Sequence, residues 1–135
     1  MEDSWSRDEL AGCNINELEL AASTFGLVAL AAECGWSNVY SFTDNTSAMA
    51  WMRGSSPPSV VAQELSASRV EWMLANSISE SAERITSESN LWADQGSRGD
   101  IQLVIRQAER MSLRPRRVAI PDGWRASLTS SPSPA

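Results

Sequence analysis

The sequence contains no lysine and no histidine, and its eleven basic residues are all arginines. These absences exclude lysine Schiff-base chemistry, a phosphate-binding lysine of the Walker type, histidine general bases and histidine metal ligands. Cysteine is scarce as well: Cys13 and Cys34 lack the spacing of a metal or redox pair, which fits a reducing intracellular setting. Metal chemistry in this chain would therefore have to be done by carboxylates.

Long hydrophobic runs and a secretory signal are also missing. The longest strongly apolar stretch, residues 25–32, is far shorter than the roughly 20 residues that span a bilayer. The first seven residues are too acidic and too polar for a signal peptide. We therefore expect a soluble intracellular protein, in the cytoplasm or the nucleus, without a membrane partner.

The size, composition and charge of the chain predict one acidic domain. Its 135 residues, 42% of them hydrophobic, are enough for a single core. Seventeen acids against eleven arginines give a net charge of −6, so the chain is no bulk polycation. Six of the arginines nevertheless lie in residues 100–135, beside only three acids. This basic segment is either a surface for a nucleic-acid backbone or the solvated face of a helix followed by an arginine-rich turn.

Apolar spacing and helix-capping residues predict an alternation of helices and strands. We expect helices at residues 14–33, 45–53, 59–76, from about 89 onward, and 100–111. We expect strands at residues 39–43, 78–85 and 117–120, and a floppy serine- and proline-rich tail at 129–135. Such an alternation predicts an α/β fold in which helices cover an open sheet.

Three acids stand out within these elements. Asp44 directly follows the first strand, where open α/β sheets bind their ligands, although its position taken alone favours a cap of the next helix. Asp94 lies one turn into a helix, and Glu19 lies on an otherwise apolar stretch. Glu17 is about 200° around the helix from Glu19 and cannot share its site. Converging carboxylates suit Mg²⁺, and two such ions about 3.5–4 Å apart can activate a water against a phosphodiester.

Three motifs follow one another along the chain: Asn16-Glu17-Leu18-Glu19-Leu20-Ala21-Ala22, then Thr43-Asp44-Asn45-Thr46-Ser47-Ala48, and then Arg84-Ile85-Thr86 leading to Asn90-Leu91-Trp92-Ala93-Asp94-Gln95-Gly96-Ser97-Arg98. In their order and spacing they resemble the ribonuclease H domain of retroelement reverse transcriptases. The resemblance covers residues 15–99. It implies a ribonuclease H-like core at 15–99, a non-matching segment at 1–14, a C-terminal helix and strand extension at 100–128, and a disordered tail at 129–135.

In that family four acids hold two Mg²⁺ ions, and a water cuts the RNA strand of an RNA–DNA hybrid. The resemblance therefore implies Mg²⁺ or Mn²⁺ as cofactor and an RNA–DNA hybrid or another nucleic acid as partner. The catalytic and metal-binding residues that it implies are Glu19, Asp44 and Asp94. The nucleic-acid-binding residues that it implies are Asn45, Arg84, Asn90 and Arg98.

The chain departs from the family in two places. The family's first acid lies on the first strand of a three-stranded meander, and residues 1–14 are too few to form that meander. Asp3 and Asp8 are the aspartates in this segment, and neither lies in a strand-like run. Arg84 stands where the family has a mobile-loop histidine, and an arginine cannot shuttle a proton at neutral pH.

We interpret the chain as a ribonuclease H-like domain truncated at its N-terminus, with a mixed sheet flanked by helices. Its activity alone should be impaired, and a partner, a swapped strand or an upstream reverse transcriptase segment would complete its sheet. The alternatives are a non-catalytic module for nucleic-acid or protein interaction, or a relic that retains the fold. The tryptophans at 36, 51, 72 and 92 are interpreted as packing residues rather than base-stacking platforms.

Overall fold

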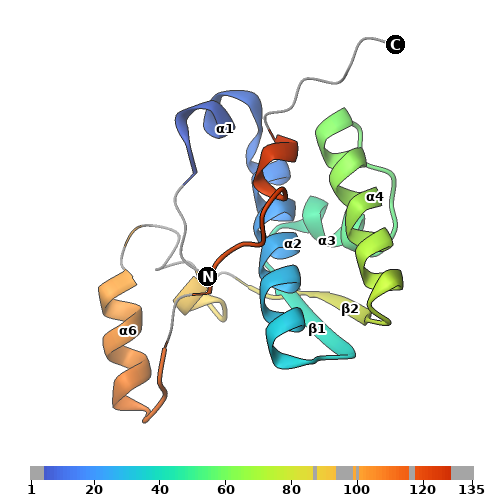
Figure 1. Cartoon of the computed structure of the whole chain (residues 1–135). Helices are drawn as coiled ribbons and strands as arrows, with labels where there is room; N and C mark the ends of the chain where they lie inside the picture. The colour runs from blue at the N-terminus through green and yellow to red at the C-terminus, as the bar shows by residue number, and fades with distance from the viewer. Residues whose placement is uncertain (1–4, 87, 94–98, 100, 116–117, 129–135) are drawn as a thin grey trace.

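The computed structural model describes residues 5–86, 88–93, 99, 101–115 and 118–128. Its elements, in chain order, are α1 (Arg7–Gly12), α2 (Ile15–Cys34), β1 (Asn38–Thr43), α3 (Thr46–Met52), α4 (Val60–Ala75), β2 (Ser79–Arg84), α6 (Ile101–Arg110) and the 3₁₀ helix η1 (Arg125–Leu128). Residues 91–93 are also helical. The protein is thus a mixed α/β chain with a small parallel sheet (Figure 1). Within these residues, no helix has both the length and the apolar character of a membrane span.

Helix α2 begins and ends at the residues that its sequence favours. The Asn14 side chain accepts the Glu17 backbone N–H at 2.9 Å, and the Glu17 carboxylate accepts the Asn14 backbone N–H at 2.8 Å. This reciprocal capping box satisfies two backbone donors at the helix start. At the other end, Gly35 adopts the left-handed conformation, with φ of 68°, that glycine adopts without strain. The predicted helix at 14–33 is confirmed.

A β–α–α–β unit follows α2. Its strands pair in parallel from Asn38 opposite Ser79 to Thr43 opposite Arg84. The helices between them start at side-chain caps: Asn45 accepts the backbone N–H of Ala48 for α3, and Ser59 that of Ala62 for α4. The strands predicted at 39–43 and 78–85 and the helices predicted at 45–53, 59–76 and 100–111 are confirmed.

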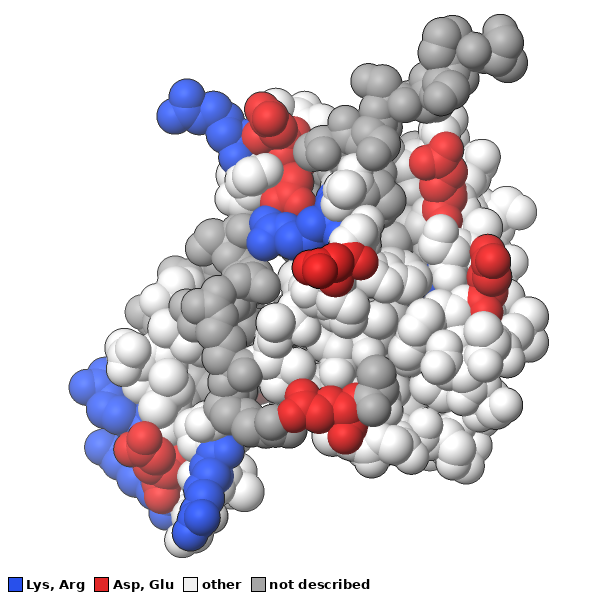
Figure 2. Space-filling view, viewed as in Figure 1, with Lys and Arg blue, Asp and Glu red and all other residues white. Residues whose placement is uncertain are grey.

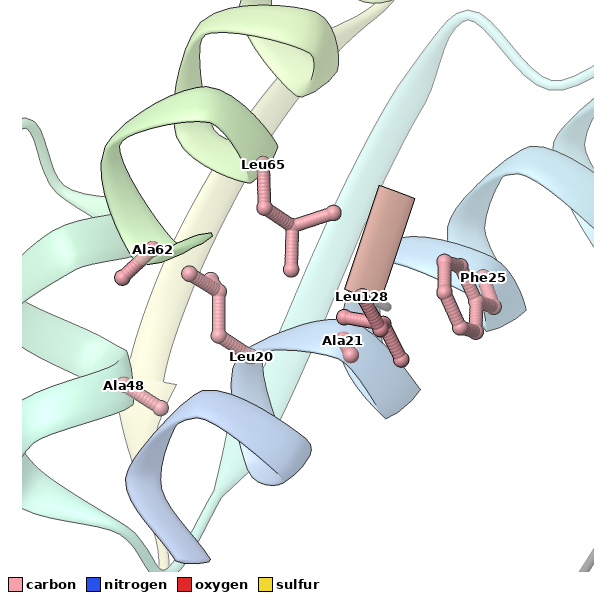
Figure 3. Packing of buried hydrophobic residues seen from close by; sticks show 7 residues of the cluster. All are labelled: Leu20, Ala21, Phe25, Ala48, Ala62, Leu65 and Leu128. Atoms are coloured by element: carbon pink, nitrogen blue, oxygen red, sulfur yellow. The ribbon is translucent and has the colours of Figure 1, made fainter. Parts of the chain in front are cut away.

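The hydrophobic core is built around α2, which packs against α3 and α4. Its largest fully buried side chains include Phe25, Leu20 and Leu65. The residues of this cluster are Leu20, Ala21, Phe25, Ala48, Ala62, Leu65 and Leu128 (Figure 3). Trp51 packs against this cluster and Trp72 against a second one at the far end of α2, as the interpretation of the tryptophans requires. Trp36, by contrast, is 43% exposed.

The prediction of a strand at 117–120 is wrong for the part of it that is described. Residues 118–120 are irregular, and Ile120 packs against the core instead of joining a sheet. Three apolar residues followed by Pro121, which has no N–H to donate, make a poor strand, and burial of Ile120 satisfies the same apolar pattern. The predicted C-terminal extension is therefore a helix followed by irregular chain and η1. The sheet of the described residues is parallel, and not mixed as predicted.

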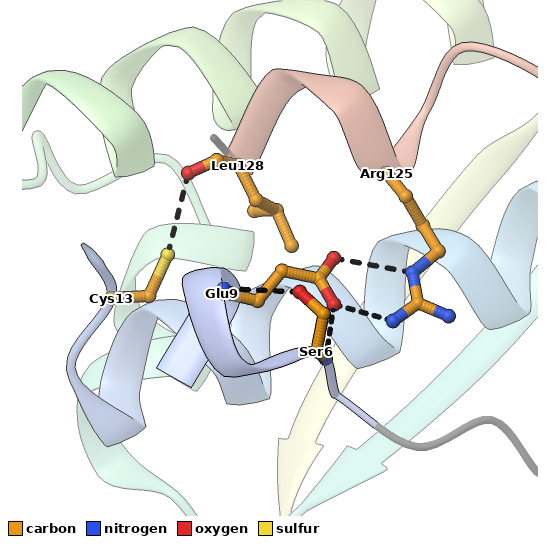
Figure 4. A network of polar contacts seen from close by, with 5 residues as sticks. All are labelled: Ser6, Glu9, Cys13, Arg125 and Leu128. Atoms are coloured by element: carbon orange, nitrogen blue, oxygen red, sulfur yellow. Dashed lines mark hydrogen bonds and ion pairs between the residues drawn. The ribbon is translucent and has the colours of Figure 1, made fainter. Parts of the chain in front are cut away.

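The N-terminal segment and η1 are joined by a cluster of polar contacts (Figure 4). Helix α1 was not predicted, although Ser6 and Glu9 form its capping box. The buried Glu9 carboxylate pairs with Arg125, and the guanidinium of Arg125 lies 5.7 Å from the ring centroid of Trp5. The hydrogen bonds from Arg125 lower the pKa of Glu9, against the opposing effect of burial. The two ends of the described chain are thereby held together.

Candidate carboxylate site

The turn after β1 places Asp44 at the carboxyl end of the parallel sheet. Thr43, the last residue of the strand, is buried, and its hydroxyl accepts the backbone N–H of Asn45 at 3.1 Å. The Asn45 side chain in turn accepts the backbone N–H of Ala48 at 2.8 Å. Asn45 is therefore the cap of α3, and the alternative in which Asp44 caps this helix is wrong. Asp44 lies at the sheet end where open α/β sheets bind ligands.

One hydrogen bond ties this turn to the first part of α2. The side-chain amide of Asn45 donates to the side-chain oxygen of Asn16 at 2.8 Å. Asn16 and Glu19 are three residues apart on α2 and therefore lie on the same side of the helix. This hydrogen bond holds Glu19 near the carboxyl end of β1, which is where Asp44 lies.

The charge of Asp44 acts on the carboxyl of Glu19. Burial raises the pKa of Glu19 above its ordinary value, and the negative charge of Asp44 raises it further. Glu19 is half-buried, and so is Asp44. The structure thus brings together two of the three acids that were predicted to form the site. Their mutual repulsion would be relieved by a bound cation or by a proton on Glu19.

Glu17 belongs to a different environment, as expected from its position on the helix. Its side chain is buried and accepts the backbone N–H of Asn14 and the hydroxyl of Ser59, the latter at 2.6 Å. Glu17 therefore links the starts of α2 and α4, and its role is structural.

Two of the predicted nucleic-acid-binding residues also lie in the described part of the chain. Arg84 ends β2 opposite Thr43 and is exposed, so it lies at the same end of the sheet as Asp44. Asn90 is half-buried, and its backbone N–H donates to the carbonyl of Thr86 at 3.0 Å. Arg84 therefore lies at the sheet end that carries Asp44, while Asn90 is held by a turn beyond β2.

The remaining predicted residues, Asp94 and Arg98, lie outside the described residues. Among the residues that are described, no three acids or cysteines form a group that could hold a metal ion. Glu19 and Asp44 still fit Mg²⁺ in donor chemistry, because this ion binds carboxylate oxygens and usually keeps several waters beside one or two carboxylates.

Several exposed arginines lie on α6 and shortly after it. Figure 2 shows basic side chains gathered at one end of the molecule, over α6. Arg106, Arg110 and Arg114 are exposed there, while Ala108 on the same helix is buried. The exposure of these arginines is compatible with both interpretations of the basic segment, a solvated helix face and a surface for nucleic acid.

Sequence reasoning missed a buried ion pair behind the sheet. Arg69 of α4 and Glu80 of β2 pair with side chains only 2% and 3% exposed, and Glu80 also accepts the hydroxyl of Ser41 at 2.6 Å. Nothing in the sequence distinguishes these two residues from solvated charges.

Comparisons with known proteins found no protein-family model, no curated protein and no solved structure that matches this chain.

Proposed function

We propose that the chain is a ribonuclease H-like domain of retroelement origin that hydrolyses the RNA strand of RNA–DNA hybrids by two-metal chemistry. The observation that carries this proposal is the proximity of Glu19 and Asp44 at the carboxyl end of a parallel sheet. The order of α2, β1, α3, α4 and β2 supports it further, because the first two motifs of the resemblance lie on the elements that they require.

The roles of the residues follow from their chemistry. Bound Mg²⁺ or Mn²⁺ would act as a Lewis acid on the phosphodiester and lower the pKa of a coordinated water. Glu19 and Asp44 would hold the cation through their carboxylates, with Asp94 as the third acid. Arg84 would hold a phosphate as a fixed cation, and Asn90 and Arg98 would contact the nucleic acid. Asn45 holds the turn after β1 through its bonds to Asn16 and Ala48, and it would also contact the nucleic acid.

Hydrolysis by the chain alone is proposed to be weak. Residues 7–12 form a helix, and Asp8 is an exposed residue of it, so the described N-terminal residues supply no acid on a strand. Arg84 cannot replace the proton transfer of a histidine. Full activity would then depend on an acid from a partner, such as a segment of a reverse transcriptase.

Thermal melting with divalent cations tests the metal site. Mn²⁺ should raise the melting temperature of the wild type, because a ligand that binds only the folded state stabilises it. The response should be lost in Glu19→Gln, Asp44→Asn and Asp94→Asn. Glu64→Gln, which changes an exposed acid on α4, is the matched control and should respond like the wild type. A wild-type melting temperature that does not change with Mn²⁺, as in the three variants, would remove the proposal.

Assays with an RNA–DNA hybrid separate catalysis from binding. Slow cleavage of the RNA strand that needs Mn²⁺ and is lost in Asp44→Asn supports the proposed hydrolase. Binding that weakens with salt, without cleavage by the wild type, would instead support the non-catalytic module.

A further inference from the structure

The two outer edges of the sheet are protected differently. On β2, the backbone carbonyl of Ala82 accepts a hydrogen bond from Nε of Arg53 at 2.7 Å, and the same guanidinium pairs with Glu83 at 3.2 Å. The charged side chain of Arg53, the residue directly after α3, thus covers this edge. Such a cover is one of the devices by which proteins keep a sheet edge from pairing with another chain.

The other edge, on β1, has no such cover in the part of the chain that is described. At one end of the ladder the Ser79 N–H donates to the Ser37 carbonyl. At the other end the Ile85 N–H donates to the Thr43 carbonyl. Along a strand, the backbone N–H and carbonyl groups of successive residues point to alternate sides. The backbone groups of the odd-numbered residues of β1 therefore point to β2. The N–H and carbonyl groups of residues 38, 40 and 42 therefore point to the outer edge.

The side chains along this edge are uncharged, and two of them are large and exposed. Tyr40 is 71% exposed and Phe42 is 59% exposed. They lie on the outer face of the sheet, while Val39 packs with α2 and α4 on the inner face. Strand β1 contains no charged residue and no proline, which are the usual guards of an edge. Parallel sheets are normally covered on both faces, whereas the outer face of this sheet exposes Tyr40 and Phe42.

We infer that β1 is a dimerisation edge and that its occupant is the β1 strand of a second copy of this chain, paired antiparallel about a two-fold axis. The arrangement that uses all three outward-facing residues places Tyr40 opposite the partner's Tyr40, and Phe42 opposite the partner's Asn38. The result is a continuous sheet of four strands whose two outer edges are both the protected edge of β2.

A second copy fits this edge because the edge is complementary to itself. Antiparallel pairing of one strand with its own copy matches every outward donor with an acceptor. Each chain has a net charge of −6, yet the pairing strand brings no like charges face to face. Tyr40 becomes partly buried against the partner's Tyr40, which also lies diagonally from Phe42, and such cross-strand contacts stabilise neighbouring strands.

This inference does not rest on the proposed hydrolase, because no acid takes part in the pairing. A reverse transcriptase strand that completed the sheet at this edge would compete with the second copy. Sedimentation equilibrium of the full chain tests it directly. The wild type should approach twice the 14.7 kDa of one chain as its concentration rises. Phe42→Lys should weaken dimerisation at least about tenfold, because it places a charge in the pairing row. Leu74→Lys, at a 77% exposed position on α4, is the matched control and should dimerise normally.

Tyr40→Pro adds a test of the hydrogen bonds themselves. The N–H that proline lacks at this position points away from β2, so the β1–β2 ladder keeps its bonds while the dimer loses two. Circular dichroism confirms that each variant is folded. A wild type that stays at the mass of one chain at every concentration overturns the inference, and so does a folded Phe42→Lys that dimerises like the wild type.

Discussion

The side-chain amide of Asn45 donates to the side-chain oxygen of Asn16 at 2.8 Å, across 29 positions of the sequence. This hydrogen bond joins the start of α3 to the first part of α2, on the side of α2 that carries Glu19. It links the first two motifs of the chain in space. The proximity of Glu19 to Asp44 follows from this link.

Replacing Asn16 with alanine should therefore loosen the site without disturbing the caps. The variant leaves the Asn45 amide without its partner, and we expect a loss of about 1 kcal/mol in the free energy of unfolding. The pKa of Glu19 should move back toward its ordinary value. Urea unfolding measures the first effect and an NMR titration of the carboxylates the second. Asn45→Ala should cost more, since it also removes the cap of α3; an equal loss in both variants would contradict this assignment.

Glu19 should make the protein less stable as pH rises. Its pKa is higher in the folded state than the ordinary 4.5, so the folded state binds the proton more tightly than the unfolded one. Stability therefore falls as pH rises from 4.5 through the raised pKa of Glu19. Without metal, Glu19→Gln should melt higher than the wild type above this window and equally below it. Melting curves between pH 4 and 8 in the presence of a chelator check this, and a variant that melts lower at neutral pH would refute it.

The ion pair between Arg69 and Glu80 should be costly to break from one side. Both side chains are buried, so Arg69→Met leaves an uncompensated carboxylate behind the sheet. We expect a loss of about 3–5 kcal/mol for this variant and a large recovery when Glu80→Leu is added. A double-mutant cycle in urea measures the coupling. Additive losses from the two substitutions would show that the pair contributes no coupling.

The contact between Glu9 and Arg125 should have the opposite pH dependence to Glu19. Arg125 lowers the pKa of Glu9, so the pair stabilises the protein above the ordinary pKa of 4.5 and loses this effect as pH falls through the lowered pKa. Arg125→Met should lower the melting temperature at pH 7, with a difference from the wild type that shrinks under acid conditions. Amide exchange should increase in η1, whose Leu128 packs in the core. A difference that does not change with pH would show that the ion pair is not its cause.

The elements could be predicted where their signals are local. Asn14, Asn45 and Ser59 each supply a cap within three residues of the N–H that they bind, so the starts of α2, α3 and α4 were predicted well. The false strand at 117–120 has another origin. A strand needs a pairing partner elsewhere in the chain, which local sequence does not show. Ile120 packs against the core instead.

The site could be predicted only in part, for the same reason. Helical periodicity could not say which face of α2 carries Glu19, and only the resemblance joined this residue with Asp44. The hydrogen bond that ties the Asp44 turn to α2, between Asn45 and Asn16, spans 29 positions. The pair of Arg69 and Glu80 had no sequence signal, since an arginine on a helix and an acid on a weak strand resemble solvated charges.

The most direct test of the central claim is an NMR titration of the Glu19 side-chain carboxyl with and without Mg²⁺. A cation shared by Glu19 and Asp44 favours the charged form of Glu19, so millimolar Mg²⁺ should lower its pKa from the raised value toward or below that of an ordinary glutamate. In Asp44→Asn the starting pKa should already be lower, and Mg²⁺ should shift it much less. A Glu19 pKa that stays raised and unchanged in the wild type, at every Mg²⁺ concentration, would contradict the claim that these two acids form a metal site.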